Sequence, residues 1–228
     1  TARSTGMLIT FEGIDGSGKS TQAQRLVEHL RAEGRNPLLV REPGRTALSD
    51  RVRSLLLDSG LDIEPLAELL LFSAARAQLV TEKIKPALRA GRIVVCDRFY
   101  DSTTAYQGAG RQLEDIGWLQ QFHGKVTGGL VPNRTYLVEV PPEVAHTRRT
   151  QPAGAAPPDR MESSDAAFYR RVAAAYAALA ERERERFVRL DGERSIDALH
   201  ADIWADLQAL EASSAGTAPT GGGSSDAP

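Results

Sequence analysis

One eight-residue stretch near the N-terminus constrains the fold of this chain more than any other part of it. Residues 13–20 read Gly-Ile-Asp-Gly-Ser-Gly-Lys-Ser, which matches the pattern G-x-x-x-x-G-K-[ST]. Its glycines let the backbone curl so that successive N–H groups point at phosphate oxygens, and the helix that follows adds its positive N-terminal end. The apolar residues 8–11 precede it and a helical pattern follows it, as the motif requires. The stretch therefore predicts a phosphate-binding loop within an α/β fold.

Two side chains of this phosphate loop are expected to take part in chemistry. Lys19 would reach the β- and γ-phosphates of ATP and act in catalysis, and the Ser20 hydroxyl would bind Mg²⁺. The whole loop and the residue after it are predicted to bind ATP: Gly13, Ile14, Asp15, Gly16, Ser17, Gly18, Lys19, Ser20 and Thr21. The chain has no Asn-Lys-x-Asp motif for reading guanine, which argues against a GTPase.

Strand-like and helix-like segments alternate along the rest of the chain. Short apolar strands are expected at 8–11, 37–41, 93–96, 135–140 and 187–190. Helical patterns cover 19–33, 48–57, 66–90, 143–150, 166–185 and 196–210. Such alternation implies a parallel five-stranded sheet with helices on both faces, which is the three-layer P-loop NTPase fold.

Composition favours one compact domain in a reducing compartment. Cys96 is the sole cysteine, so no intrachain disulfide can form, and no apolar run approaches about 18 residues, the length of a membrane span. A net charge of −2 gives no general attraction to nucleic acid or to an anionic membrane. We therefore expect a cytoplasmic protein with neither as a partner. Residues 7–212 form the expected domain, between disordered extensions over 1–6 and 213–228.

A second candidate site follows the buried strand at 93–96. Asp97 and Arg98 would lie at the carboxyl end of that strand, the edge where α/β proteins bind ligands. Asp97 could hold Mg²⁺ or its waters, or accept hydrogen bonds from the acceptor, and Arg98 could clamp an acceptor phosphate. An ordinary surface ion pair is the open alternative.

Four short motifs occur in an order and spacing that resemble thymidylate kinase. They are Phe-Glu-Gly-Ile-Asp-Gly-Ser-Gly-Lys-Ser-Thr at 11–21, Arg-Glu-Pro-Gly at 41–44, Asp-Arg-Phe through Ala-Tyr-Gln-Gly at 97–108, and Asp-Arg-Met-Glu at 159–162. The resemblance covers about residues 7–210. It implies a nucleoside monophosphate kinase fold over the domain, ATP and Mg²⁺ as cosubstrate and metal, dTMP as the phosphoryl acceptor on the way to dTTP, and a homodimer.

The resemblance also implies roles for single residues in acceptor binding. It makes Phe72 the ring that stacks on thymine and Arg76 a donor to a thymine carbonyl, and positions four apart do share one helix face. Asp15 would lie near the acceptor sugar or phosphate and act in catalysis with Arg98, which would bind the acceptor phosphate. Thr103, Tyr106 and Gln107 would surround the base and sugar, with Tyr106 excluding a 2′-hydroxyl by its bulk.

Two departures from the family pattern lead to further predictions. Arg45 replaces a glycine that bacterial members usually carry; either it contacts the acceptor phosphate, as an arginine of eukaryotic members does, or it faces solvent. Gly16 stands where some members place a catalytic arginine. The missing positive charge is expected from arginines beside the Pro-, Ala- and Gly-rich residues 151–158, which are either a plain surface loop or part of a small lid over about 148–164. These arginines are Arg148, Arg149 and Arg160, of which Arg149 and Arg160 are the preferred catalytic candidates.

Two other functions stay open on the sequence alone. A deoxynucleoside kinase would need a carboxylate as base on a free 5′-hydroxyl, and Glu12 is the candidate. A nucleotide-binding regulator would bind ATP without turnover. Two further patterns are read as non-functional: the charge run 181–186 as a solvated helix end, and the four histidines, which show no metal-ligand spacing.

Overall fold

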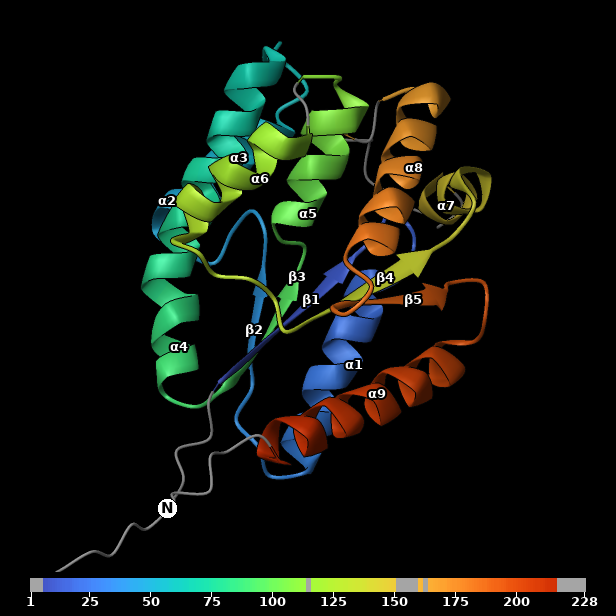
Figure 1. Ribbon diagram of the computed structural model, residues 1–228. Coiled ribbons are helices and arrows are strands. Elements are labelled where there is room, and N and C mark those ends of the chain that lie inside the picture. The colour runs from blue at the N-terminus through green and yellow to red at the C-terminus, as the bar shows by residue number, and fades with distance from the viewer. Residues whose placement is uncertain (1–5, 114–115, 151–159, 162–163, 217–228) are drawn as a thin grey trace, which may run out of the picture.

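Five parallel strands form the centre of the molecule. The structure is a computed structural model that describes residues 6–113, 116–150, 160–161 and 164–216 of the 228-residue chain. Within these residues the sheet has the order β2-β3-β1-β4-β5, and every neighbouring pair is parallel (Figure 1). The strands are β1 (Met7–Glu12), β2 (Leu38–Arg41), β3 (Ile93–Asp97), β4 (Arg134–Glu139) and β5 (Phe187–Asp191). The predicted fold class is confirmed, and each predicted strand lies within one residue of its place.

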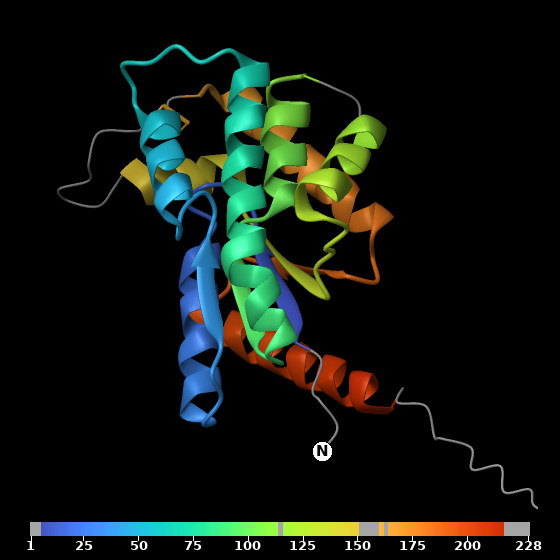
Figure 2. The ribbon, with the colours of Figure 1, turned by 90° about the vertical axis from the view of Figure 1, so that its left-hand side faces the viewer.

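Helices cover both faces of this sheet. In chain order they are α1 (Lys19–Ala32), α2 (Ala47–Leu57), α3 (Pro65–Leu79), the π-helical turn η1 (Val80–Ile84), α4 (Lys85–Arg89), α5 (Tyr100–Thr103), the π-helical turn η2 (Thr104–Gly110), α6 (Ile116–Thr127), α7 (Pro142–Thr150), α8 (Ala166–Arg182) and α9 (Ile196–Gly216). Figure 2 shows α3 and α4 as one long column beside β2. On one face, Ile9 and Phe11 of β1 pack against α1 and α9. On the other, Leu8 packs against the column, because successive strand side chains point to opposite faces.

The helical column differs from the prediction in one respect. The pattern at 66–90 predicts a single helix, whereas the structure places the π-helical turn η1 in its middle. Pro86 lies in the next turn and has no backbone N–H to donate to the carbonyl four residues earlier. A local π-helical turn is one of the ways in which a helix adapts to such a break.

A helical segment that the sequence did not predict follows β3. Residues 100–110 form α5 and η2, and α6 follows after a short connection. This segment carries Ser102, Thr103, Tyr106 and Gln107. It therefore places most of the predicted base-binding residues on a continuous helix that begins just beyond the carboxyl end of β3.

The C-terminal part corrects two further predictions. Helix α9 continues to Gly216, six residues beyond the predicted end, so the first four residues of the predicted tail are helical; the rest of the tail lies outside the described residues. The charge run is not wholly solvated. Arg186 is buried and donates two hydrogen bonds of 2.8 Å to the buried carboxylate of Asp101. No helix among the described residues is long and apolar enough to span a membrane.

Candidate active site

The phosphate loop has the geometry that the motif predicts. It connects the buried end of β1 to the first turn of α1, which begins at Lys19. Gly13, Gly16 and Gly18 all have positive φ angles, of 139°, 86° and 99°. A Cβ atom on Gly16 would lie 2.5 Å from the carbonyl oxygen of Ala145 in α7 and 3.2 Å from Cγ of Arg149. An arginine therefore cannot occupy position 16 here without moving α7.

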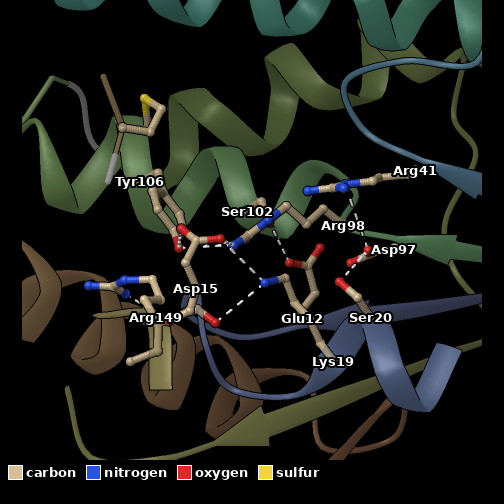
Figure 3. A network of polar contacts seen from close by, with 12 residues as sticks. Glu12, Asp15, Lys19, Ser20, Arg41, Asp97, Arg98, Ser102, Tyr106 and Arg149 are labelled. Carbon is tan, nitrogen blue, oxygen red and sulfur yellow. Dashed lines mark hydrogen bonds and ion pairs between the residues drawn. The ribbon is translucent and has the colours of Figure 1, made fainter. Parts of the chain in front are cut away.

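Lys19 and Asp15 face each other across this loop. The Nζ of Lys19 lies 3.5 Å from Oδ1 of Asp15 and 3.4 Å from the carbonyl oxygen of Ile14 (Figure 3). The lysine side chain is buried, and burial lowers its pKa, with the neighbouring Arg98 charge lowering it further. Burial works in the opposite direction on Asp15, but the charges of Arg98 and Lys19 outweigh it and hold the pKa of Asp15 well below its usual range. Asp15 is therefore ionised.

Arg98 connects the phosphate loop to the helix that follows β3. One terminal nitrogen donates to Asp15 Oδ1 at 2.5 Å and to the Tyr106 hydroxyl at 3.0 Å, and the other donates to Ser102 Oγ at 2.9 Å (Figure 3). Its guanidinium also lies over the Tyr106 ring, 4.9 Å from the centroid. Its backbone φ of 71° is unusual for a residue with a side chain. This turn aims the guanidinium back over the phosphate loop instead of out to solvent. The alternative prediction, in which Arg98 forms only an ordinary surface ion pair, is therefore wrong.

Ser20 and Asp97 are in direct contact. The Ser20 hydroxyl donates to Oδ2 of Asp97 at 2.6 Å, and Oδ1 of Asp97 is buried without a hydrogen-bond partner in the described structure. The described residues contain no cluster of three or more acidic, histidine or cysteine side chains suited to a metal. Mg²⁺ is commonly held by one or two protein ligands together with phosphates and water, so a serine hydroxyl and one free carboxylate oxygen fit it.

A pocket opens next to the phosphate loop, between α2, α3 and the helix after β3. Most of the predicted acceptor residues line it: Asp15, Phe72, Arg76, Arg98, Thr103, Tyr106 and Gln107. Further lining residues were not predicted as site residues: Arg41, Glu42, Pro43, Arg53, Leu57, Ser102 and Met161. Arg41, Glu42 and Pro43 belong to a motif that pointed only to the family, and Arg53 and Leu57 carry no signal beyond their place on an amphipathic helix.

Arg76 is held in the wall of this pocket by a buried carboxylate. Its Nε donates to Glu42 Oε2 at 2.7 Å, and one terminal nitrogen donates to the Phe99 carbonyl at 3.2 Å. The other terminal nitrogen is buried without a partner among the described residues. Burial raises the pKa of Glu42 to about 7, although the Arg76 charge opposes the rise. The arginine thus keeps one N–H group free for a ligand oxygen.

The predicted lid arginines occupy two different places. Arg149 donates to the carbonyl oxygen of Asp15 at 2.7 Å and lies over the Tyr169 ring, 4.5 Å from its centroid. Arg148 donates to backbone oxygens of Ser17 and of the loop after β5. Both therefore lie against the phosphate loop. Arg160 contacts the Leu56 carbonyl and forms an ion pair with Glu68 at 2.6 Å, away from that loop. Residues 151–159, the centre of the predicted lid, lie outside the described structure.

Two other candidates lie outside the pocket lining. Arg45 is exposed, and its backbone N–H donates to Oδ1 of Asp50, which agrees with the solvent-facing alternative. Glu12 is fully buried and accepts hydrogen bonds from Phe99 N, Ser102 Oγ and Tyr176 OH at 2.7, 2.6 and 2.9 Å. The three donors enclose the carboxylate, and Glu12 does not line the acceptor pocket, so the geometry does not favour Glu12 as the base of a deoxynucleoside kinase.

The chain is similar in sequence and fold to known proteins of one family. A family model described as thymidylate kinase matches residues 11–203. A thymidylate kinase of Deinococcus radiodurans is 48% identical over 202 residues, covering 89% of this chain and 96% of the relative. One of Chlorobium luteolum is 46% identical over 203 residues, covering 86% of this chain and 94% of the relative. Among solved structures, the crystal structure of thymidylate kinase from Ehrlichia chaffeensis superimposes with a TM-score of 0.71 at 36% identity, covering 89% of this chain and 98% of that chain.

Proposed function

The chain belongs to the thymidylate kinase family, and on that basis we propose how its residues carry out the reaction. The protein is an ATP-dependent kinase that transfers the γ-phosphoryl group of ATP to dTMP and so forms dTDP and ADP. An oxygen of the acceptor phosphate attacks the γ-phosphorus. The bond from that phosphorus to the β–γ bridging oxygen breaks, and ADP leaves with the electron pair.

One observation carries the assignment of roles: Arg98 bonds to Asp15 of the phosphate loop and also lines the acceptor pocket. A guanidinium in that place would lie between the donor and acceptor phosphates once both nucleotides are bound. We assign to Arg98 the binding of the acceptor phosphate and to Lys19 the binding of the β- and γ-phosphates. Asp15 would hold the side chains of Arg98 and Lys19 in position. Arg41 and Arg53 add positive charge to the same pocket. Little covalent chemistry is required of the protein in phosphoryl transfer, so this positioning supplies most of the catalysis.

The base end of the pocket supports the roles of the remaining residues. The Phe72 ring would stack on thymine, and the free N–H group of Arg76 would donate to a thymine carbonyl. Thr103, Tyr106 and Gln107 would contact the sugar and the base edge. Tyr106 is fixed by its hydrogen bond to Asp15, at 2.9 Å, and a ring held so firmly would resist a ribose 2′-hydroxyl.

Two further assignments concern charge at the phosphates. Ser20 and Asp97 would hold Mg²⁺, which when bound neutralises negative charge on the β- and γ-phosphates. Arg149 is the preferred arginine for the moving phosphoryl group, because it already lies at the phosphate loop. Arg160 and Arg45 remain predictions, with contacts that lie away from the phosphate loop.

We also propose a cytoplasmic homodimer without nucleic-acid or membrane partners. Large apolar side chains are exposed on neighbouring helices: Leu48 and Leu55 of α2, Leu66 and Leu70 of α3, and Trp118 of α6. A contiguous patch of such side chains is typical of a protein–protein contact, and we propose that these helices form the dimer face. Sedimentation velocity of the parent and of the double variant Leu66→Glu/Leu70→Glu tests this proposal. We expect the parent to sediment as a dimer and the variant as a monomer.

One panel experiment tests the function. Release of ADP from ATP is measured with thymidine, dTMP, dUMP, dCMP and UMP as acceptors. The proposal predicts turnover with dTMP and little with thymidine. Turnover with thymidine alone would indicate a deoxynucleoside kinase, and ATP binding without acceptor-dependent ADP release would indicate a regulator.

A further inference from the structure

A buried carboxylate on α3 lies behind the base end of the acceptor pocket. Glu68 is fully buried and receives donors from three residues of other segments. Nε2 of Gln107 lies 2.7 Å from its Oε1, and terminal nitrogens of Arg111 and Arg160 lie 3.3 and 2.6 Å from its Oε2. Glu68 does not line the pocket itself, whereas Gln107 does. Gln107 therefore gives Glu68 a direct route to a bound nucleotide.

The charge on Glu68 fixes which way the Gln107 amide faces. The Glu68 carboxylate is paired with two guanidinium groups and accepts the hydrogen bond from Nε2 of Gln107. Gln107 must then turn its NH₂ group toward Glu68. Its carbonyl oxygen then points away from Glu68, and Gln107 lines the pocket. The pocket is thereby given a hydrogen-bond acceptor.

The rings of thymine and cytosine differ at the atoms that such a pocket would contact. Thymine carries N–H at ring position 3 and a carbonyl at position 4, whereas cytosine carries an unprotonated nitrogen and an amino group there. The carbonyl of Gln107 can accept from the N–H at position 3 of thymine, and the free N–H group of Arg76 can donate to the carbonyl at position 4. In cytosine, the same two protein groups would face an acceptor and a donor that they cannot pair with. A site that must leave a buried polar group unpaired rejects the mismatched ligand strongly.

We propose that Glu68 is a positioning residue that sets the hydrogen-bonding polarity of Gln107, so that the acceptor site takes a thymine or uracil ring and rejects cytosine. This inference rests on the proposed function, because it concerns recognition of the acceptor base. It assigns to the ion pairs of Glu68 with Arg111 and Arg160 a part in substrate choice as well as in packing.

The test exchanges the carboxylate for an amide. In Glu68→Gln the new side chain can donate or accept, so Gln107 is free to turn either way. We expect KM for dTMP to rise about 10-fold while kcat changes little, and the preference for dTMP over dCMP in kcat/KM to fall at least 10-fold. The preference for dTMP over dUMP should stay unchanged, because the two bases share the edge in question. Glu82→Gln makes the same change at an exposed position of the same helical column and is the matched control.

A double variant keeps the test decisive if Glu68→Gln is merely destabilised. In Glu68→Gln/Gln107→Glu the amide donates to the carboxylate with the roles exchanged, and the second carboxylate oxygen again offers an acceptor to the base. Recovery of the dTMP over dCMP preference in the double variant supports the proposal. A preference that Glu68→Gln leaves unchanged, or that the double variant fails to recover, overturns it. If the parent phosphorylates no monophosphate, it is the proposed function that fails.

Discussion

The hydroxyl of Ser20 donates to Oδ2 of Asp97 at 2.6 Å and so joins the first turn of α1 to the carboxyl end of β3. The other carboxylate oxygen of Asp97 is buried without a partner among the described residues, although burying an unpaired acceptor is costly. The pair thus offers a metal two oxygen ligands that are already close together.

Asp97→Asn should weaken the binding of Mg²⁺ more than the binding of ATP. The amide keeps an acceptor for Ser20 but loses the negative charge that would favour a divalent cation. We expect the Mg²⁺ concentration for half-maximal velocity to rise about 10-fold or more, with the circular dichroism spectrum unchanged. An unaltered Mg²⁺ requirement would remove Asp97 from the metal site.

Lys19→Met should keep the fold and abolish most turnover. Methionine is of similar length and fills the buried space, and Asp15 keeps Arg98 as a partner. The lost charge would stabilise the β–γ bridge in the transition state, so we expect kcat to fall about 100-fold or more. Steady-state ADP release measures the effect. Turnover within about threefold of the parent, well under one decade of rate, would contradict the role of the phosphate loop.

Arg149→Ala should lower kcat while leaving affinities nearly unchanged. Its guanidinium lies at the phosphate loop, and an arginine beside the moving phosphoryl group can contribute about 10³-fold or more in rate. A loss confined to kcat is the sign of an interaction made mainly in the transition state. Arg160→Ala is the comparison, and its contacts predict a change in KM for dTMP instead. If Arg149→Ala kept the parental kcat while Arg160→Ala lost most of it, the catalytic role would belong to Arg160 instead of Arg149.

Arg76→Ala should weaken dTMP binding specifically. Loss of a donor to a buried thymine carbonyl costs on the order of 1–3 kcal/mol, so KM for dTMP should rise by one to two decades while KM for ATP stays near the parental value. The substitution also leaves Glu42 buried and unpaired, and the free energy of unfolding should fall. Glu42→Gln breaks the same pair but keeps the guanidinium, and it should raise KM for dTMP much less. Equal losses for ATP and dTMP would show a folding defect instead.

Glu12→Gln should change how stability depends on pH. Burial raises the pKa of Glu12 from 4.5 to about 7, with the nearby Asp101 charge adding to the rise. The folded protein then binds a proton more tightly than the unfolded chain, so this contribution to stability is complete below about pH 4.5 and is lost as the pH rises through 7. Between pH 5 and pH 8 the parent should lose on the order of 2–3 kcal/mol relative to the variant. Urea unfolding at several pH values measures this. A difference that stays constant with pH would contradict the prediction.

The sequence by itself determined the fold class, the phosphate loop and the family. The loop is readable because its function depends on eight consecutive residues: the turn needs its glycines, and Lys19 and Ser20 lie on the helix that the turn begins. The buried strand at 93–96 is readable for a similar reason, since a continuous apolar run is what a parallel strand covered on both faces requires. The predicted thymidylate kinase activity is confirmed by the comparisons.

Only the tertiary structure decided which side chains share an environment. The sequence predicts roles for Arg76 and Gln107 but not the buried carboxylates that hold them. Glu42 lies 34 residues from Arg76, and Glu68 lies 39 residues from Gln107, so each pair meets only when the elements pack. Arg186 looked solvated within its charge run and is buried against Asp101 for the same reason. Helix α5 and η2 gave no clear periodic signal, since the segment is rich in threonine and glycine and is almost entirely buried. Local patterns specify the elements, but the partners of a buried charge are fixed by long-range packing, where removal from water makes each pairing obligatory.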